Sequence, residues 1–396
     1  MKIYEIGTGY TPIPAKMGAA TEIVVEELTR AMLRQGADVE IIDIQAEERL
    51  PNQLPITEVK VPRCFAGTDV QLGIMHKLKR VVYSICLARK LAGILKKEEK
   101  KVVLHFHNQY NMFFYLKMVP HKLRQKALTA YTNHSGVWSL PWDECKEVVR
   151  KRYFQEEECM KKADIVFALN QKTISNVVEY CGVAAEKFIR INNGVNTEIY
   201  HVLTDAEKEE TKEAYGLAGK KIILQVGSVC ENKGQNKVIQ WLAPVLKRTP
   251  DLVYAYAGGI VSEEYHQQMK TTAREENVED QVVYLGMVQP GQKLNQVYNA
   301  AEATVCASGF EGFSLAIVES LAAGTPVLIQ EGSSFHVGNG CVLYTGKTIG
   351  ALIGEMMAMP EKHMSTRDEA RQNACDHYSW DKIAQEYRGH FGKAEK

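Results

Sequence analysis

Two glutamates eight positions apart, Glu311 and Glu319, mark the segment whose residues could most clearly do chemistry. They lie in GFEGFSLAIVESLAAGTPVLIQ, residues 309–330, where the pattern predicts a loop followed by a helix that begins near Ser314. The loop would present backbone N–H groups at the helix N-terminus, where the positive end of the helix dipole also attracts anions. Gly312 would let a ligand approach the backbone closely. The segment therefore predicts a phosphate site with a carboxylate on either side.

The elements that must hold this segment follow a regular alternation. Short β-branched or aromatic runs recur between longer helical patterns, which implies parallel strands joined by right-handed helical crossovers. In the first half of the chain these runs are residues 2–6, 38–44, 102–107, 128–134, 165–170 and 188–193. After a polar segment at 204–216, the second half repeats the alternation with residues 221–227, 252–259, 281–286, 303–308, 326–330 and 341–346. The chain is therefore expected to be an α/β protein with two sheets.

Composition limits the class of protein. The 396 residues are 45% hydrophobic, enough to build two substantial cores. Lys+Arg and Asp+Glu are 48 each, so the net charge gives no reason to expect nucleic acid as a partner. The nine cysteines are scattered singly, without zinc-ligand spacing, which predicts free thiols in a reducing compartment. No run approaches the roughly 18 apolar residues of a membrane span, and we expect a cytoplasmic protein.

The segment with the two glutamates resembles family 4 of the retaining glycosyltransferases, whose Glu-x7-Glu motif is written E-G-F-G/S-L-x-x-x-E. Every written position is matched, by Glu311, Gly312, Phe313, Ser314, Leu315 and Glu319. The resemblance extends along nearly the whole chain, and it implies the GT-B fold, in which two Rossmann-like domains face across a cleft. The implied parts are an acceptor-binding domain over 1–200, a nucleotide-sugar-binding domain over 201–377, and a helix over 378–396 that crosses back to the first domain.

The resemblance also implies roles for the residues of the motif. Glu311 would contact the donor sugar, the backbone of 312–315 its diphosphate, and Glu319 the ribose hydroxyls. A carboxylate suits two hydroxyls because each charge-assisted hydrogen bond is worth roughly 1.5–3 kcal/mol. Gly286, which ends the run QVVYLG, falls in the same donor site. The alternative is an ordinary Rossmann-like turn with two surface glutamates.

A second loop, GSVCENKG at 227–234, also follows a strand-like run. In the resembled family it usually reads G-R-x-x-x-x-K-G, and its arginine and lysine neutralise the departing diphosphate. Lys233 matches the lysine and is expected to serve in donor binding and catalysis, whereas Ser228 stands at the arginine position. Losing one preorganised donor commonly costs about 2.7–4 kcal/mol. Either another cation compensates, for which Lys16 and Lys237 are candidates, or activity is weak, or the diphosphate is held differently.

The N-terminal half contributes further candidates. Gly18 matches a family glycine that gives the diphosphate access to the backbone, although the usual second glycine is Ala19 here. His134 resembles a family histidine beside the sugar, where a neutral imidazole could bond a hydroxyl or steady the reacting centre. A histidine of the core or of the acceptor groove is the alternative. His105 and His107 alternate on one strand, and no third ligand of suitable spacing is apparent, so we expect no metal site.

The function implied by the resemblance is a metal-independent, retaining hexosyltransferase. It would move a sugar from a UDP- or GDP-sugar to a hydroxyl of a saccharide or lipid-linked acceptor, in the assembly of a surface polysaccharide or glycolipid. No Asp-x-Asp motif stands in a plausible loop after a strand, so no obligatory metal cofactor is expected. The alternatives are a sugar-nucleotide epimerase or a sucrose-type synthase or phosphorylase. A weakly catalytic partner subunit that binds nucleotide-sugar is a further alternative, to which Ser228 points.

Residues 76–101 form a basic segment with two interpretations. Leu78, Val82, Ile85, Leu91 and Leu95 make a rough apolar stripe among nine Lys/Arg. Such a helix can lie on an anionic membrane, where each cation near the surface adds about 1 kcal/mol. The alternative is a helix that covers the sheet and exposes a solvated basic face. Peripheral contact with the inner membrane face therefore remains open.

Overall fold

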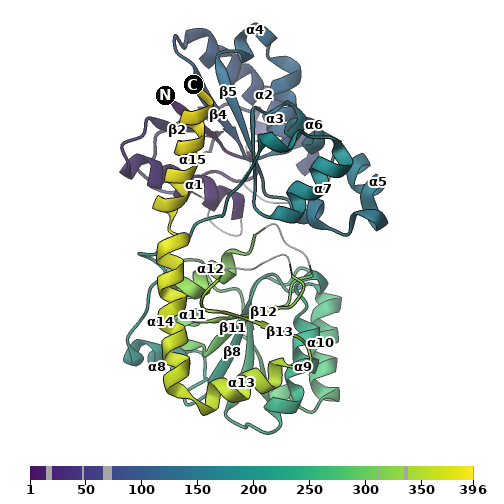
Figure 1. Ribbon diagram of the computed structural model, residues 1–396, viewed down its shortest axis with the longest axis vertical. Helices are drawn as coiled ribbons and strands as arrows, with labels where there is room; N and C mark the ends of the chain where they lie inside the picture. Colours follow the sequence, from purple (N-terminus) through teal and green to yellow (C-terminus); the bar gives the residue numbers. More distant parts are fainter. Residues whose placement is uncertain (15–19, 47–48, 66–73, 310–312, 334–337, 396) are drawn as a thin grey trace. The chain divides into compact units, whose positions relative to one another are not determined.

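A computed structural model describes residues 1–14, 20–46, 49–65, 74–309, 313–333 and 338–395 (Figure 1). The chain divides into two compact units, the first made of Met1–Gly194 and Trp380–Lys396 and the second of Val195–Ser379. The sequence placed these boundaries after residues 200 and 377. They fall at Val195 and Ser379 because the Val195 N–H donates to the Tyr378 carbonyl over 2.6 Å and the Val195 side chain packs in the core of the second unit.

The first unit contains one parallel seven-stranded sheet, in the order β3-β2-β1-β4-β5-β6-β7. The strands are β1 (Ile3–Ile6), β2 (Val39–Ile44), β3 (Ile56–Val59), β4 (Val102–Phe106), β5 (Ala127–Asn133), β6 (Ile165–Ala168) and β7 (Phe188–Arg190). Five of them lie within the predicted runs, and β5 begins one residue before its run. Strand β3 was not predicted, since its residues ITEV form a short, half-exposed edge strand without a continuous apolar run.

Helices cover both faces of this first sheet (Figure 1). They are α1 (Ala20–Arg34), α2 (Ile74–Lys97), α3 (Gln109–Met118), α4 (His121–Arg124), α5 (Trp142–Arg152), α6 (Phe154–Lys162), α7 (Gln171–Cys181) and α15 (Trp380–Glu395). The buried side chains of α2, α3, α6 and α7 join one apolar core with Ile6, Leu104 and Phe106 of the strands. On the opposite face, α15 packs against α1 and β5.

The C-terminal helix α15 is fixed in the first unit by its apolar stripe. Tyr387 and Phe391 are fully buried and lie 4.5 and 5.8 Å, centroid to centroid, from the Phe167 ring of β6. At the start of α15, Trp380 packs so closely on Gly194 that a Cβ on that glycine would lie 2.4 Å from the indole. The apolar stripe of Trp380, Ile383, Tyr387 and Phe391 is therefore buried in the first unit, as the expected helix over 378–396 requires.

The second unit repeats the design with a parallel six-stranded sheet, in the order β10-β9-β8-β11-β12-β13. Its strands are β8 (Lys221–Val226), β9 (Leu252–Ala257), β10 (Val282–Tyr284), β11 (Ala303–Cys306), β12 (Val327–Gln330) and β13 (Cys341–Tyr344). Its helices are α8 (Asp205–Ala214), α9 (Gln235–Leu246), α10 (Glu263–Glu275), α11 (Gln292–Ala300), α12 (Leu315–Ala322), α13 (Ile349–Ala358) and α14 (Pro360–His377). Leu224 and Ile223 of β8 belong to different apolar cores, as expected for a strand covered on both faces. The predicted α/β fold with two Rossmann-like domains is confirmed.

The strand order determines which loops come together. In the second sheet β8 lies between β9 and β11, and the chain reverses its winding direction there. In open α/β sheets, ligands bind at such a switch point, beyond the carboxyl ends of the strands. The loops that follow β8 and β11 are the two that the sequence singled out, and they leave neighbouring strands at this edge.

Candidate functional site

The loop after β8 and the segment after β11 are in direct contact. The Gly309 N–H donates to the Asn232 carbonyl over 2.9 Å. Gly234, at the end of the loop, has φ +70°, and a Cβ there would lie 2.6 Å from the Ala307 carbonyl oxygen. Only glycine allows this close approach without strain. The backbone therefore joins the loop that carries Lys233 to the segment that leads toward Glu311.

Contacts of both the backbone carbonyl and the side chain hold Lys233 in place. Its carbonyl accepts a hydrogen bond from Gln225 Nε2 over 2.7 Å, and Gln225 in turn accepts one from the Tyr254 hydroxyl, also over 2.7 Å. The Lys233 side chain lies over Gly227, with Cε 3.3 Å from where a Cβ would stand. Lys233 is half-buried, whereas Ser228 and Lys237 are exposed. The amine is thus positioned above the start of its own loop.

Helix α12 begins as the sequence predicted. Ser314 is its N-cap residue with an extended backbone, and its side chain makes no capping hydrogen bond within the described part of the chain. The first-turn N–H groups of such a helix have no intrahelical partner. Phe313 packs against the Tyr378 ring at 6.4 Å, which anchors the chain just before the helix, and Leu315 opens the helix itself. Glu311 and Gly312 lie outside the described residues.

Glu319 lies on α12 and is held by tyrosines that the sequence did not single out. The Tyr298 hydroxyl, from α11, donates to Glu319 Oε2 over 3.0 Å. Burial raises the pKa of Glu319, while hydrogen bonds from Tyr298 and Tyr200 oppose that increase. Tyr200 is itself placed by the Gly291 N–H, which donates to its hydroxyl over 3.2 Å. These bonds fix the carboxylate and leave it lone pairs for further donors.

Gly286 belongs to the same edge of the second sheet. It follows β10 with φ +80°, in the left-handed region, and its carbonyl accepts from the Gly258 N–H over 3.0 Å. The loops after β9 and β10 are thereby tied together, and the Tyr284 hydroxyl adds a hydrogen bond of 2.7 Å to the Gly258 carbonyl. Gly286 therefore contacts the loop after β9, and β9 is the strand next to β8, whose following loop carries Lys233.

The first unit has a polar cluster at the carboxyl edge of its sheet. Glu5, His105 and His107 are fully or almost fully buried on the face covered by α15. Glu5 accepts from His105 Nδ1 at 2.9–3.0 Å and from His107 Nε2 at 2.7 Å. His107 Nδ1 lies 3.0 Å from Nε2 of the half-buried His134. His134 is therefore connected to a buried carboxylate through one other imidazole.

This cluster corrects one expectation about metal ligands. The sequence offered no third ligand near His105 and His107, whereas parallel pairing of β1 with β4 puts Glu5 directly opposite His105. The three residues have ligand atoms within 4.8 Å of one another, which is compatible with a metal ion. Their direct N···O separations of 2.7–3.0 Å are nevertheless those of hydrogen bonds. The described geometry is a hydrogen-bonded cluster.

Two predicted residues of the first unit, Lys16 and Gly18, lie outside the described residues. The chain just before them is anchored by Asp43, whose Oδ2 accepts from the Ile13 N–H over 2.8 Å and from Arg49 Nη1 over 2.7 Å. A buried carboxylate of this kind is ordinarily paired, as it is here. Its role is to hold the loop after β1.

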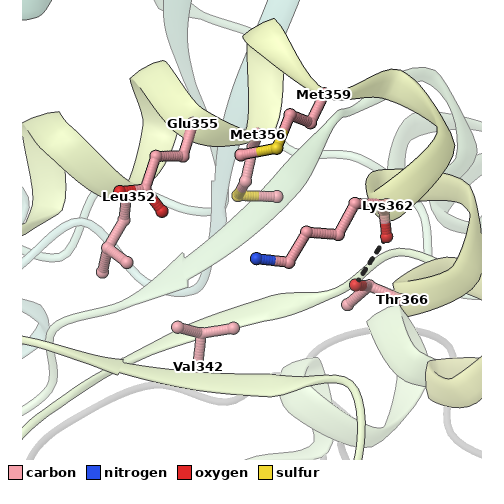
Figure 2. A pocket seen from close by; sticks show the side chains of 7 residues that line it. All are labelled: Val342, Leu352, Glu355, Met356, Met359, Lys362 and Thr366. Atoms are coloured by element: carbon pink, nitrogen blue, oxygen red, sulfur yellow. Dashed lines mark hydrogen bonds between the residues drawn. The ribbon is translucent and has the colours of Figure 1, made fainter.

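The described residues also form a pocket of about 120 Å³ in the second unit. Figure 2 shows the side chains that line it. It is lined by Val342 of β13, Leu352, Glu355 and Met356 of α13, Met359, and Lys362 and Thr366 of α14. None of these residues comes from a loop that follows β8, β10 or β11. The pocket is therefore not part of the predicted donor site.

The helices in the described part of the chain include none with the length and apolar composition of a membrane span.

Comparison with known proteins agrees with this arrangement. The family model of Glycosyltransferase Family 4 matches residues 21–199, and that of Glycosyl transferases group 1 matches residues 207–337. Mannosylfructose-phosphate synthase of Agrobacterium fabrum is 23% identical over 219 residues, which are 53% of this chain and only 47% of that protein. An uncharacterized glycosyltransferase of Methanocaldococcus jannaschii is 24% identical over 98% of this chain and 96% of its own length.

A solved structure extends the similarity to the whole fold. HepE of Anabaena, crystallised in complex with UDP, superposes with a TM-score of 0.74 at 14% identity, over 99% of this chain and all of that one. The two family models together with the two Rossmann-like units identify a glycosyltransferase of the GT-B fold. The chain belongs to the group 1 glycosyltransferases of family 4.

Proposed function

We propose that the protein is a retaining glycosyltransferase that moves a sugar from a nucleotide-diphosphate sugar to a hydroxyl acceptor. The observation that carries this proposal is the hydrogen bond from Gly309 to Asn232, which joins the lysine loop to the segment before α12. A diphosphate at this edge would meet the Lys233 amine and the N–H groups of the α12 N-terminus together. Glu311 would contact the sugar, and Glu319 the ribose.

Catalysis would then consist of positioning the substrates and stabilising the leaving group. In a retaining reaction the new bond forms on the face that the nucleotide leaves, and the departing phosphate can itself accept the proton of the acceptor hydroxyl. Charge develops on the diphosphate in the transition state, so a preorganised cation and backbone donors lower the barrier. His134 would lie beside the sugar and bond one of its hydroxyls.

The proposed reaction does not require a divalent metal ion. Lys233 and backbone amides supply the positive charge that a metal would otherwise bring to the diphosphate. Activity should therefore survive EDTA, measured as release of nucleoside diphosphate from donor and acceptor. A complete loss that manganese or magnesium restores would reject this part of the proposal.

The substrate class and setting follow from the same reasoning. HepE of Anabaena is described in complex with UDP, which supports a UDP- or GDP-sugar as the donor. The acceptor would be a saccharide or a lipid-linked saccharide, in the assembly of a surface polysaccharide or glycolipid. The eight cysteines whose side chains the structure describes carry free thiols, which supports a cytoplasmic site of action.

Three other functions call for a direct test. A sugar-nucleotide epimerase or a sucrose-type synthase would use the same fold. A partner subunit that binds the donor without transferring it is favoured by Ser228, which is exposed at a position where a cation is expected. Incubation with donor alone separates the classes. A transferase hydrolyses the donor slowly, an epimerase interconverts it, and a binding subunit leaves it unchanged, and this last result together with no transfer to any acceptor would overturn the proposal.

A further inference from the structure

A continuous chain of hydrogen bonds crosses three strands of the first sheet. It runs from Thr132 of β5 through His105 and Glu5 to His107, and ends at His134. Thr132 Oγ1 lies 2.7 Å from His105 Nε2, and the remaining contacts on the way to His134 are 2.7–3.0 Å. Every member before His134 is buried, and His134 is the half-buried end of the chain.

Glu5 sets the direction of the two hydrogen bonds that lead from it through His107 to His134. Burial alone would raise the pKa of Glu5, but the adjacent His105 and His107 imidazoles lower it to about 2, so the side chain is ionised. An ionised carboxylate only accepts hydrogen bonds. The Nε2 atom of His107 must therefore carry a proton and donate it to Glu5 over 2.7 Å.

The same logic continues to His134. Burial, reinforced by repulsion from His105, lowers the pKa of His107 to about 4, so this ring is neutral at pH 7. A neutral imidazole with its proton on Nε2 has a bare Nδ1, which accepts. That nitrogen lies 3.0 Å from His134 Nε2, so the His134 Nε2–H donates to it. Burial also holds the pKa of His134 well below its usual value, and its Nδ1 is left as an acceptor.

We propose that Glu5 and His107 are positioning residues that fix His134 as the Nε2–H tautomer, so that its Nδ1 lone pair accepts a hydrogen bond from a hydroxyl of the sugar substrate. The substrate class rests on the proposed function, whereas the tautomer does not. His134 follows β5 as His107 follows β4, and neighbouring parallel strands end at the same edge of a sheet. The buried carboxylate thus acts on the end of the chain through one imidazole, as the orienting acid of a catalytic triad does.

A cluster that only stabilised the fold would not require one particular tautomer of His134. Packing needs only that each polar atom has a partner, and the His107–His134 contact is satisfied with the proton on either nitrogen of the pair. If His107 were doubly protonated, it would donate from Nδ1, and His134 would carry its own proton on Nδ1 instead. The tautomer of His134 therefore separates the two cases.

The first experiment measures that tautomer in the full-length protein. Long-range proton–nitrogen correlation spectra of protein labelled with ¹⁵N-histidine distinguish a protonated ring nitrogen from a bare one. The chain has 11 histidines, and the signals of His134 and His107 are assigned by their loss in His134→Gln and His107→Asn. We expect both rings to be neutral at pH 7, with protons on Nε2 only. A proton on His134 Nδ1 would overturn the inference, whatever the activity.

The second experiment removes the acceptor and then restores it. His107→Phe keeps a buried ring but offers His134 no acceptor, whereas His107→Asn places an amide oxygen close to the position of Nδ1. Transfer should fall about tenfold in His107→Phe, the effect of one hydrogen bond of ordinary strength, and recover in part in His107→Asn. Nucleoside diphosphate affinity, assigned to the other unit, should not change in either variant.

A matched control uses Thr132, at the other end of the chain of hydrogen bonds. Thr132→Val removes a buried hydroxyl that contacts His105 and Tyr387 but neither His107 nor His134. The His134 tautomer should persist in this variant, and equal loss of transfer in Thr132→Val and His107→Phe would contradict the inference. If the wild-type protein transfers no sugar at all, the proposed function fails, while the tautomer measurement still decides whether Glu5 and His107 orient His134.

Discussion

The hydroxyl of Tyr298 lies 3.0 Å from Glu319 Oε2 and donates to it from the neighbouring helix α11. This bond, with a second from Tyr200, determines the orientation of the one glutamate of the motif that the structure describes. In the proposed function Glu319 accepts two ribose hydroxyls, and such a carboxylate benefits from being oriented before the ligand arrives. We therefore expect the contact with Tyr298 to affect nucleotide affinity.

Tyr298→Phe should weaken binding of nucleoside diphosphate about tenfold, since one hydrogen bond that orients Glu319 is lost. Glu319→Ala should weaken it further. Isothermal calorimetry with UDP and GDP measures both. Tyr256→Phe is the matched control, because its hydroxyl contacts His266 Nε2 at 2.9 Å and not Glu319. Unchanged affinity in both Tyr298→Phe and Glu319→Ala would rule out a ribose contact at Glu319.

Lys233→Ala should lower affinity for nucleoside diphosphate and lower turnover more strongly. The amine is fixed above Gly227 and would meet the charge that grows on the leaving diphosphate, an effect commonly worth about 10²-fold in rate. Lys247→Ala is the control, since this lysine is exposed at the C-terminal end of α9 and no role in donor binding is assigned to it. Steady-state release of nucleoside diphosphate gives the comparison. Equal behaviour of the two variants would show that the diphosphate does not depend on Lys233.

The sequence revealed most of the fold because the strands are covered on both faces. Consecutive apolar runs such as VVLHF and LVYAYA became β4 and β9, whereas the half-exposed edge strand β3 left no such run. Only part of the candidate site could be predicted from the sequence. Lys233 and Glu319 stand at fixed offsets within local motifs, and local spacing is what a single sequence reports. The partners that orient the side chains come from distant segments.

Glu5 illustrates what the sequence could not supply. It lies opposite His105 because β1 pairs with β4 in one register, a relationship between residues 100 positions apart. The signal that was available is a charged residue in the middle of the buried run IYEI, since a fully buried carboxylate ordinarily has a partner. Tyr298 and Tyr200 gave no comparable signal, because tyrosine is common in α/β cores.

Helix α2 should bind membranes, if at all, only through its charge. Of the apolar stripe expected from the sequence, Leu91 and Leu95 are buried in the core of the first unit, Val82 and Ile85 are half-buried, and Leu78 is exposed. Most of the stripe is therefore not available for insertion. Arg89 and Lys90 belong to its exposed face. Any sedimentation with anionic vesicles should therefore disappear at high salt, because exposed charges are screened over about 10 Å at 0.1 M.

Two matched variants test this prediction, and each reverses the charge of two exposed basic residues. Arg89→Glu with Lys90→Glu should abolish vesicle binding at low salt, while Lys247→Glu with Arg248→Glu, in the second unit, should not. Neutral vesicles should sediment no protein. Salt-resistant binding, or equal binding to neutral and anionic vesicles, would contradict a purely electrostatic attachment.

The pH dependence of stability provides a test of the buried cluster that does not involve substrate. Burial lowers the pKa of His107 from 6.5 to about 4 in the folded protein. Between these pH values the unfolded chain binds a proton that the folded chain does not, so the free energy of unfolding falls as the pH falls. For His107 alone, the loss between pH 6.5 and 5 is roughly 1.5 kcal/mol. Below about pH 4 the full penalty is present.

Other buried groups titrate as well, so the comparison must isolate His107. The chain has four tryptophans, and Trp241 is the one in the second unit, so unfolding in urea followed by fluorescence in a Trp241→Phe background reports the first unit. His107→Phe in this background removes the titrating ring and should remove the same loss of roughly 1.5 kcal/mol between pH 6.5 and 5. If both proteins lose stability in parallel over this interval, then His107 is not held neutral beside Glu5, and the direction of the hydrogen bond to His134 is not set in the way inferred above.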